Sequence, residues 1–240
     1  MDRSKLLEFF NASEYDDTFN VVGCGAIGSH VCEELARLGI ENIALYDFDT
    51  VDAHNITNQM FTQADIGEAK VDVCEKMIHA INPEAHVTKY SKGIEEPFAC
   101  EGIIILCVDN IDLRRKIVEA NRFNPYCKVI MDFRMRLTDA QYYFADTTQE
   151  YQVENLLSSM DFTHEEAKAA TPTSACGVEL SVVYTVKAIT AMGVANLVKW
   201  LLEHENYKTM ILVNMHNFQV DAFKAMPRKK FTKEVLPDNL

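Results

Sequence analysis

The segment from Phe19 to Asp49 constrains the fold of this chain more than any other part of its sequence. Two short apolar runs in this segment flank one amphipathic helical pattern, and the first run stops at the sequence GCGAIG, residues 23–28. The second run ends at Asp47. A strand, a glycine turn, a helix and a second strand in this order form the opening unit of a doubly wound α/β sheet.

The glycine turn and the acidic residue that follows it indicate nucleotide binding. Glycines at these positions suit a tight turn and a close approach of the backbone to phosphate, and the amides at the start of the helix attract an anion. A carboxylate at the end of the second strand accepts the hydroxyl groups of a ribose. A tight turn that binds nothing remains the alternative. The residues expected to surround the nucleotide are Gly23, Gly25, Ala26, Ile27, Gly28 and Asp47.

The remaining apolar patterns extend this unit into one domain over residues 1–240. The continuous apolar run 103–108 predicts a parallel strand that is covered on both faces. The pattern as a whole predicts a Rossmann-like, mostly parallel doubly wound sheet with additional antiparallel strands and a long helix near the C-terminus. Further helices are expected over 3–12 (within an N-terminal segment 1–15), 67–82, 112–123 and 176–203. Further strands are expected over 86–90, 128–131, 141–145, 209–215 and 218–223. We also expect a polar crossing loop with at most one helical turn over 146–175 and a flexible tail over 227–240.

Composition restricts the setting and the partners. Asp and Glu total 36 against 23 Lys and Arg, and the resulting formal charge of -13 opposes nonspecific binding to nucleic acid or to an anionic membrane. The seven cysteines form no CxxC pair, and the N-terminus lacks an apolar signal core, so we expect a reduced, cytoplasmic location. Charged and polar residues interrupt the apolar stretch 177–202, which favours a buried helix over a membrane span.

Further polar side chains fall where the predicted strands end. Lys70 lies on the first turn of a predicted helix, and Asp109 follows the buried strand, where a carboxylate holds a magnesium ion that bridges phosphates. Asn55 and Gln59 offer neutral hydrogen bonds, and Asp49 falls on the same edge of the sheet. Taken singly, Lys70 also fits a solvated helix lysine, and Asp109 a helix cap or turn residue. Asn55 and Gln59 fit a hydrogen-bonded loop equally well. Their order along the chain is what favours a triphosphate site.

A series of motifs resembles the ThiF/MoeB family, the adenylating domains of ubiquitin-activating enzymes and of sulfur-carrier activators. The series runs GCGAIG, LARLGIENIALYDFDTVDAHN, Gln59, DIGEAK at 65–70, INP at 81–83 and CVDN at 107–110. It covers residues 15–135 strongly and 174–223 more loosely. The resemblance implies ATP and magnesium as cofactors, a homodimer, and a partner that is a small ubiquitin-like or sulfur-carrier protein. The C-terminal glycine carboxylate of that partner would be converted to an acyl-adenylate.

The resemblance also implies roles for individual residues. Gly23, Gly25 and Gly28 would receive phosphate, Asp47 the ribose, Asn55, Gln59 and Lys70 the triphosphate, and Asp109 the magnesium ion. No side chain needs to act as a nucleophile in adenylation, because positioning and charge neutralisation are enough. The paired CxxC motifs that hold zinc in many relatives are absent from this sequence, so we expect no zinc.

Two departures from the family pattern bear on activity. Asn58 stands where the family has an arginine, and a neutral amide cannot supply the bidentate positive charge that arginine gives to phosphate. Arg134 or Arg136 is a candidate to compensate. Cys176 is a candidate nucleophile for a second, thiol-transfer step, with a small buried helix-start residue as the alternative.

Two other functions fit part of the sequence. An NAD-dependent oxidoreductase shares the opening unit but does not account for Lys70 and Asp109. A noncatalytic nucleotide-binding partner subunit of the same family accounts for them, and Asn58 is the main reason to consider it.

Overall fold

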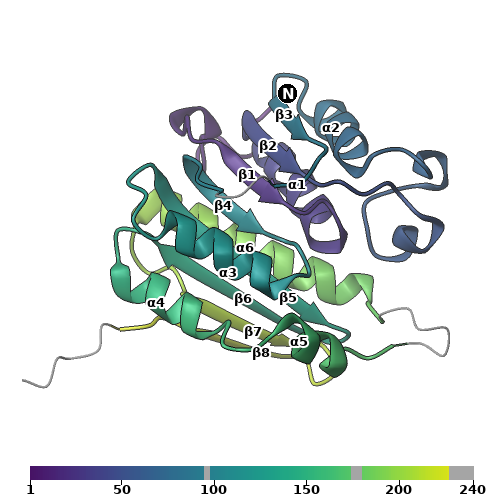
Figure 1. Ribbon diagram of the computed structural model, residues 1–240. Helices are drawn as coiled ribbons and strands as arrows, with labels where there is room; N and C mark the ends of the chain where they lie inside the picture. Colours follow the sequence, from purple (N-terminus) through teal and green to yellow (C-terminus); the bar gives the residue numbers. More distant parts are fainter. Residues whose placement is uncertain (95–97, 174–179, 227–240) are drawn as a thin grey trace, which may run out of the picture.

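One continuous eight-stranded sheet forms the centre of the protein, which a computed structural model describes over residues 1–94, 98–173 and 180–226 (Figure 1). The strand order is β3-β2-β1-β4-β5-β6-β7-β8. The strands are β1 Phe19–Val22, β2 Asn42–Tyr46, β3 His86–Tyr90, β4 Gly102–Leu106, β5 Cys127–Arg136, β6 Asp139–Asp146, β7 Met210–Asn214 and β8 Gln219–Phe223. The pairs from β3 to β5 are parallel and those from β5 to β8 are antiparallel, so the predicted sheet with added antiparallel strands is confirmed.

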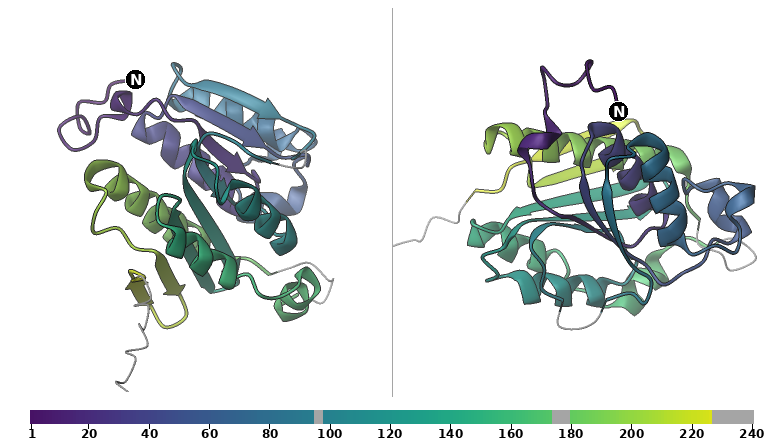
Figure 2. Two further views of the ribbon diagram at one scale, coloured as in Figure 1. Left: turned by 60° about the vertical axis from the view of Figure 1, so that its left-hand side comes forward. Right: turned by 90° about the horizontal axis from the view of Figure 1, so that it is seen from above.

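Helices cover both faces of the sheet. One face carries the larger apolar core, to which α1, α2 and α6 contribute, and the other face carries a second core beneath α3 and α4 (Figure 2). The helices are α1 Ala26–Leu38, α2 Lys70–Ile81, α3 Ile111–Asn121, α4 Glu150–Ser158, α5 His164–Ala170 and α6 Val183–Glu203, with short 3-10 turns at Ala12–Glu14, Ala53–Thr57 and Gln63–Asp65. This arrangement leaves the carboxyl ends of the parallel strands facing the loops that follow them, where ligands of such folds lie.

The long helix α6 belongs to the core. By length and composition alone it is apolar enough to cross a membrane, but 61% of its most apolar window is buried inside the protein. Its buried face includes Val186, Ile189 and Leu197, which pack with α1 and the sheet. The prediction of a buried helix in this part of the chain is therefore confirmed for residues 183–203, while 174–179 lie outside the described residues.

The predicted helix over 3–12 is wrong. The chain forms turns there, and the first helical element is the 3-10 turn Ala12–Glu14. Phe10 is buried in the core, whereas Phe9 is 67% exposed, so the apolar residues do not form one helical face. The Asn11 side chain accepts a hydrogen bond from the Ser13 amide at 3.3 Å and thereby starts the next turn.

The predicted crossing loop is also wrong, because 146–175 contains two helices. In α4 the buried residues Gln152, Val153 and Leu156 lie on one face, and α5 begins with a capping box in which Thr163 and Glu166 satisfy each other's backbone amides. The sequence of this segment looks irregular because it contains few apolar residues. The fifth strand also runs beyond the predicted 128–131, because its second half pairs with β6.

Candidate functional site

The glycine turn between β1 and α1 is held by close packing at two glycines and is open at the third. Gly23 has a φ of 93°, and its amide donates to the Tyr46 carbonyl oxygen at 2.8 Å. A Cβ atom on Gly28 would lie 1.8 Å from the carbonyl oxygen of Gly23, whereas a Cβ on Gly25 would have no atom within 4 Å. Gly25 therefore leaves room for a ligand beside the first turn of α1, whose amides have no intrahelical acceptors.

Asp47 closes the glycine turn from the end of β2. Its Oδ2 accepts a hydrogen bond from the Cys24 amide at 2.6 Å, and its Oδ1 accepts one from the Asp49 amide at 2.8 Å. Burial raises the pKa of this carboxyl group, and the two amide bonds and the positive charge of Lys70 oppose that shift. The carboxylate oxygens keep further lone pairs for a ribose hydroxyl. The turn and the predicted ribose acceptor are therefore one hydrogen-bonded unit.

Lys70 joins the same unit from the start of α2. Its ammonium group donates to Oδ2 of Asp49 at 2.8 Å, and its amide donates to the Asp49 carbonyl oxygen at 3.0 Å. Lys70 is only 7% exposed, so the alternative of a freely solvated helix lysine is wrong. Because Asp49 in turn donates to Asp47, a short chain of contacts links the ammonium to the glycine turn.

Asp109 follows the end of β4, where the backbone just before it lies against the glycine turn. The Cys107 amide donates to the Val22 carbonyl oxygen at 2.8 Å, and a Cβ on Gly23 would lie 2.9 Å from the Val108 nitrogen. Asp109 follows directly and is exposed. It is not the cap of α3, because Asn110 takes that role by accepting from the Leu113 amide at 3.0 Å.

The acidic groups at this edge bear on how magnesium would be held. In the part of the chain that the structure describes, no group of three or more His, Cys, Asp or Glu side chains could hold a metal ion. Magnesium does not require such a cage, since one or two carboxylates together with phosphate oxygens and water suffice. The single carboxylate of Asp109 fits that mode of binding.

The segment with Asn55, Asn58 and Gln59 packs against the start of α1. Asn55 is buried, and its Oδ1 accepts from the Asp52 amide at 2.9 Å, so this residue is part of a hydrogen-bonded loop. The buried Oε1 of Gln59 has no hydrogen-bond partner among the described atoms. Buried polar atoms are normally paired, so this oxygen is available to accept a hydrogen bond from a bound ligand.

Asn58 is bonded on both sides. Its side-chain amide donates to Oγ of Ser181 at 2.6 Å. Its backbone carbonyl oxygen lies 3.1 Å from the ring nitrogen Nε2 of His30 in α1. The residue therefore links the loop to the start of α6 and to the glycine-turn helix.

The two arginines that we considered as replacements for the family arginine are held by protein atoms. Arg134 donates to the Asp132 carboxylate at 2.7 Å and to the Ser159 carbonyl oxygen at 2.8 Å. Arg136 donates to the Ala170 carbonyl oxygen at 3.0 Å. Arg134 uses all three of its side-chain nitrogens in such contacts and would have to give some of them up to bind a phosphate, whereas Arg136 is exposed and keeps further N–H donors.

Sequence reasoning missed the partner that completes this buried cluster. Arg114 of α3 also binds the fully buried Asp132 carboxylate and donates to the Val108 carbonyl oxygen beside Asp109. The signal was present as a charged residue on a predicted helix directly after the CVDN motif. The cluster supports the loop that carries Asp109.

Three cysteine thiols lie together behind the glycine turn. Cys24, Cys32 and Cys74 come from the turn, from α1 and from α2, and all three are fully buried and not disulfide-bonded. The contact with Cys32 lowers the pKa of the Cys24 thiol and the contact with Cys74 raises it. Burial raises this pKa further, to well above the usual value. Protonated buried thiols pack as small apolar groups. Cys176, the candidate nucleophile, lies outside the described residues.

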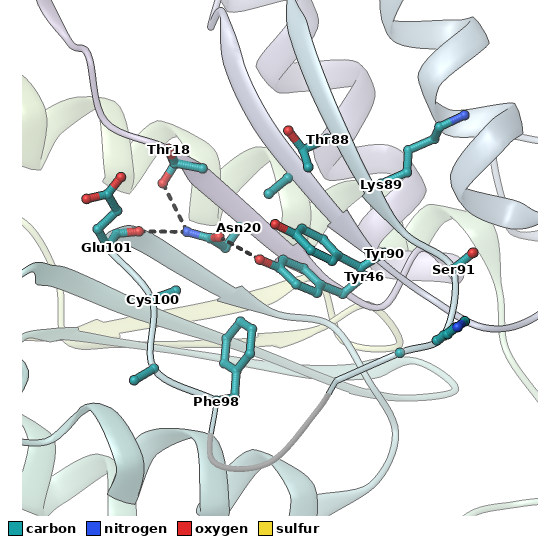
Figure 3. Close-up of a pocket in the computed structure, with 14 residues that line it drawn as sticks. Thr18, Asn20, Tyr46, Thr88, Lys89, Tyr90, Ser91, Phe98, Cys100 and Glu101 are labelled. Carbon is teal, nitrogen blue, oxygen red and sulfur yellow. Dashed lines mark hydrogen bonds between the residues drawn. The ribbon is translucent and has the colours of Figure 1, made fainter.

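A cavity of about 850 Å³ lies on a different part of the sheet (Figure 3). Tyr46 and Tyr90 stack along its wall with ring centroids 4.3 Å apart, and the Tyr46 hydroxyl donates to Asn20 at 3.3 Å. None of the predicted site residues lines this cavity. The candidate site is therefore the edge where the glycine turn, Asp49 with Lys70, and the loop before Asp109 meet.

The sheet topology and this edge define a doubly wound α/β protein with a phosphate-binding type of glycine turn. The pattern of the ThiF family matches residues 16–235, and the chain belongs to that family.

Relatives agree with this assignment, and a solved structure shares the fold. The chain is 30% identical over 123 residues to ubiquitin-like modifier-activating enzyme 5 of Oryza sativa, covering 44% of this chain and 29% of the relative. It is 28% identical over 108 residues to molybdopterin-synthase adenylyltransferase of Escherichia coli, covering 42% and 43%. The structure of Escherichia coli MccB with ATP has a TM-score of 0.67 at 17% identity over 87% of this chain and 64% of that one. The chain thus spans less than half the length of these two relatives.

Proposed function

We propose that this protein is an ATP-dependent adenylyltransferase that activates the C-terminal glycine carboxylate of a small ubiquitin-like or sulfur-carrier protein. The observation that carries the proposal is the meeting of three separate segments, at the glycine turn, at Lys70 and at Asp109, in a member of the ThiF family. The names of its relatives, a ubiquitin-like modifier-activating enzyme and a molybdopterin-synthase adenylyltransferase, support the same class of reaction.

The proposed reaction is a displacement at the α-phosphorus of ATP. A carboxylate oxygen of the carrier forms the new bond to phosphorus, the bond to the bridging oxygen breaks, and pyrophosphate leaves with the electron pair. The amides at the start of α1 would hold phosphate oxygens, and Lys70 would neutralise charge that develops on the leaving group. Magnesium held near Asp109 would supply further charge neutralisation. The chain's contribution is thus positioning and electrostatics rather than covalent catalysis.

ATP–pyrophosphate exchange in the presence of candidate carrier proteins tests the proposal. Wild-type protein is expected to catalyse exchange, and mass spectrometry is expected to show an adenylated carrier terminus. Lys70→Ala should abolish exchange, whereas Lys76→Ala should not, because Lys76 lies on the same helix but is exposed and pairs with Glu68. Absence of ATP binding by the wild-type protein would refute the proposal.

A noncatalytic partner subunit is the second candidate function. The observation that favours it is Asn58, whose side chain bonds Ser181 at 2.6 Å where the family pattern has an arginine. This second function would be favoured if the isolated chain, without any co-purified partner, binds ATP but catalyses no pyrophosphate exchange with any candidate carrier. Exchange by the isolated chain would exclude it.

Thiol transfer through Cys176 and a homodimeric assembly are further parts of the proposal. A carrier adduct that is released by dithiothreitol and is lost in Cys176→Ser would support the thiol step. Sedimentation equilibrium of the isolated chain would test the dimer.

A further inference from the structure

The position of Asp109, the proposed magnesium ligand, is not fixed by its own side chain. The residue follows β4 in a bend, outside strand and helix, and it is exposed. Within the described residues its carboxylate forms no hydrogen bond and no ion pair. Ordering a mobile side chain costs conformational entropy, so a single carboxylate serves a metal ion best where the backbone around it is held. The contacts of the neighbouring residues therefore determine where the Asp109 carboxylate lies.

Arg114 of α3 contacts the residues on both sides of Asp109. Its guanidinium Nη2 donates to the Val108 carbonyl oxygen, and its backbone amide donates to the Asn110 carbonyl oxygen at 3.1 Å. Its Nη1 also donates to the Leu106 carbonyl oxygen, at the end of β4, at 3.5 Å. One residue thus holds the chain before and after the bend that carries Asp109.

A buried carboxylate fixes the guanidinium group of Arg114. Asp132 is fully buried, and its Oδ1 accepts from Arg114 while its Oδ2 accepts from Arg134 at 2.7 Å. Arg114 is itself only 5% exposed. The N–H donors of a guanidinium group form a rigid planar fork, so the bond to Asp132 sets the direction in which Arg114 meets the Val108 carbonyl oxygen. The contact with the loop therefore depends on the shape of the arginine and not on its charge alone.

Backbone contacts with β1 tie the same loop to the glycine turn. The Cys107 amide donates to the Val22 carbonyl oxygen at 2.8 Å. A Cβ on Gly23 would lie 2.9 Å from the Val108 nitrogen. A shift of Val108 would therefore move Asp109 relative to the glycine turn, where we propose that the phosphates bind.

We propose that Arg114 is a positioning residue that holds the Asp109 carboxylate in place for a magnesium-bound nucleotide, acting through the Val108 and Asn110 carbonyl oxygens. The inference rests on the proposed function, because it concerns the same site. Arg114 acts on the loop and not on phosphate, since contacts with protein oxygens engage both of its terminal nitrogens. Lysine carries the same charge but lacks the fork, so the role requires arginine.

Calorimetric titration of ATP into the whole chain, in magnesium and in EDTA, tests this role. The wild type is expected to bind ATP more tightly in magnesium. Arg114→Lys keeps a charge for Asp132 but loses the fork that reaches Val108. Its ATP affinity in magnesium should fall about tenfold, the lower end of the range for residues that orient metal ligands, and its affinity in EDTA should be unchanged.

Arg115→Lys is the matched control. Arg115 is the next residue of α3, but it donates to the Met160 and Phe162 carbonyl oxygens instead of to the loop. This variant makes the same chemical change on the same helix. Its ATP affinity should equal that of the wild type in magnesium and in EDTA.

A double-mutant cycle separates positioning from a general effect on folding. In the Asp109→Ala background, where the carboxylate is gone, Arg114→Lys should cause no further loss of ATP affinity in magnesium. Circular dichroism melts identify variants that do not fold. If Arg114→Lys does not fold, Arg114→Gln combined with Asp132→Asn replaces the buried ion pair by two amides that can bond each other, and the same results are expected from it.

Four results would overturn the inference. If Arg114→Lys binds ATP in magnesium as tightly as the wild type, the inference is wrong and the proposed function stands. The same holds if its loss of affinity is equal in EDTA, or if the losses from Arg114→Lys and Asp109→Ala add. If magnesium does not change the affinity of the wild type for ATP, there is no metal ligand to position and the inference is wrong. If the wild type binds no ATP in either condition, the inference and the proposed function are both wrong.

Discussion

Substitution of the two glycines Gly25 and Gly28 by alanine should separate stability from ligand binding. A Cβ on Gly28 would lie 1.8 Å from the carbonyl oxygen and 2.9 Å from the carbonyl carbon of Gly23, and neither backbone atom can move without opening the turn. A Cβ on Gly25 meets no atom within 4 Å. Gly28→Ala is therefore expected to destabilise the fold, and Gly25→Ala to fill the space that a phosphate would enter.

The magnitude at Gly28 is the difference of two effects. Overpacking usually costs about 1–3 kcal/mol, and a clash with backbone atoms lies at or above the top of that range, at about 3–4 kcal/mol, whereas alanine in a helix is favoured over glycine by about 1 kcal/mol. The net cost is about 2–3 kcal/mol. For a domain of this length, each kcal/mol lowers the midpoint of thermal unfolding by roughly 2–4 °C, so Gly28→Ala should melt about 5–10 °C below the wild type.

Circular dichroism melts and ATP titrations of both variants provide the assay. Gly25→Ala should melt within about 2 °C of the wild type, since surface changes without new contacts alter stability by about 0.5 kcal/mol, and should bind ATP at least tenfold more weakly. The reasoning about the turn is refuted if Gly28→Ala is as stable as the wild type. It also fails if Gly25→Ala keeps full affinity for ATP.

Three further predictions concern charge. Burial, opposed by a hydrogen bond from Thr190, raises the pKa of Glu34 to about 7 from its usual 4.5, so the folded state holds the proton more tightly and loses stability as pH rises from about 5 to 7. The free energy of unfolding of Glu34→Gln should equal that of the wild type near pH 5 and exceed it by about 1–3 kcal/mol above pH 7. Curves of this free energy against pH that run parallel for the two proteins would contradict the prediction. Asp132→Ala leaves the buried Arg114 and the half-buried Arg134 without their carboxylate and should lower the free energy of unfolding in urea by about 3–5 kcal/mol; a loss smaller than about 1 kcal/mol would show that the cluster is not coupled to folding. Chelation of magnesium should abolish pyrophosphate exchange and added magnesium should restore it, whereas exchange that persists in excess chelator would exclude the proposed role of the metal.

The centre of the parallel half of the sheet could be predicted from sequence because β4 is short and continuously apolar, whereas β3 at the edge is polar and mostly exposed. The run that became β4 is buried along its whole length, and such a run has few other stable environments. The glycine turn was equally clear, since Gly23 and Gly28 are required by direct backbone contacts. Strong local signals therefore predicted the part of the fold that positions the site.

The segment before α6 could not be predicted because its helices are stabilised by few buried residues. Helix α5 buries none of its residues among those described, and only its capping box marks it in the sequence. Thr163 followed by Glu166 was a usable signal that apolar periodicity does not register. The same limit applied to the N-terminal turns, where Phe9 and Phe10 suggest a helix face but face opposite environments.

The sequence names candidate site residues, but it does not name the residues that they contact. The sequence indicates Lys70, but its burial and its bond to Asp49 depend on the tertiary fold. The contact of Asn58 with Ser181 joins residues far apart in the chain, and no local pattern encodes it. Motifs suggest roles for single residues, whereas the pairing of their charges follows only from the folded arrangement.

The three buried thiols behind the glycine turn give this region its own reporter. Because Cys24, Cys32 and Cys74 are fully buried with pKa values well above the usual range, an alkylating reagent can modify them only when the turn or its supporting helices open locally. The rate of alkylation at each of these cysteines, followed by peptide mass spectrometry, would therefore measure how often this part of the native protein breathes. A ligand that bridges the turn should slow all three rates together.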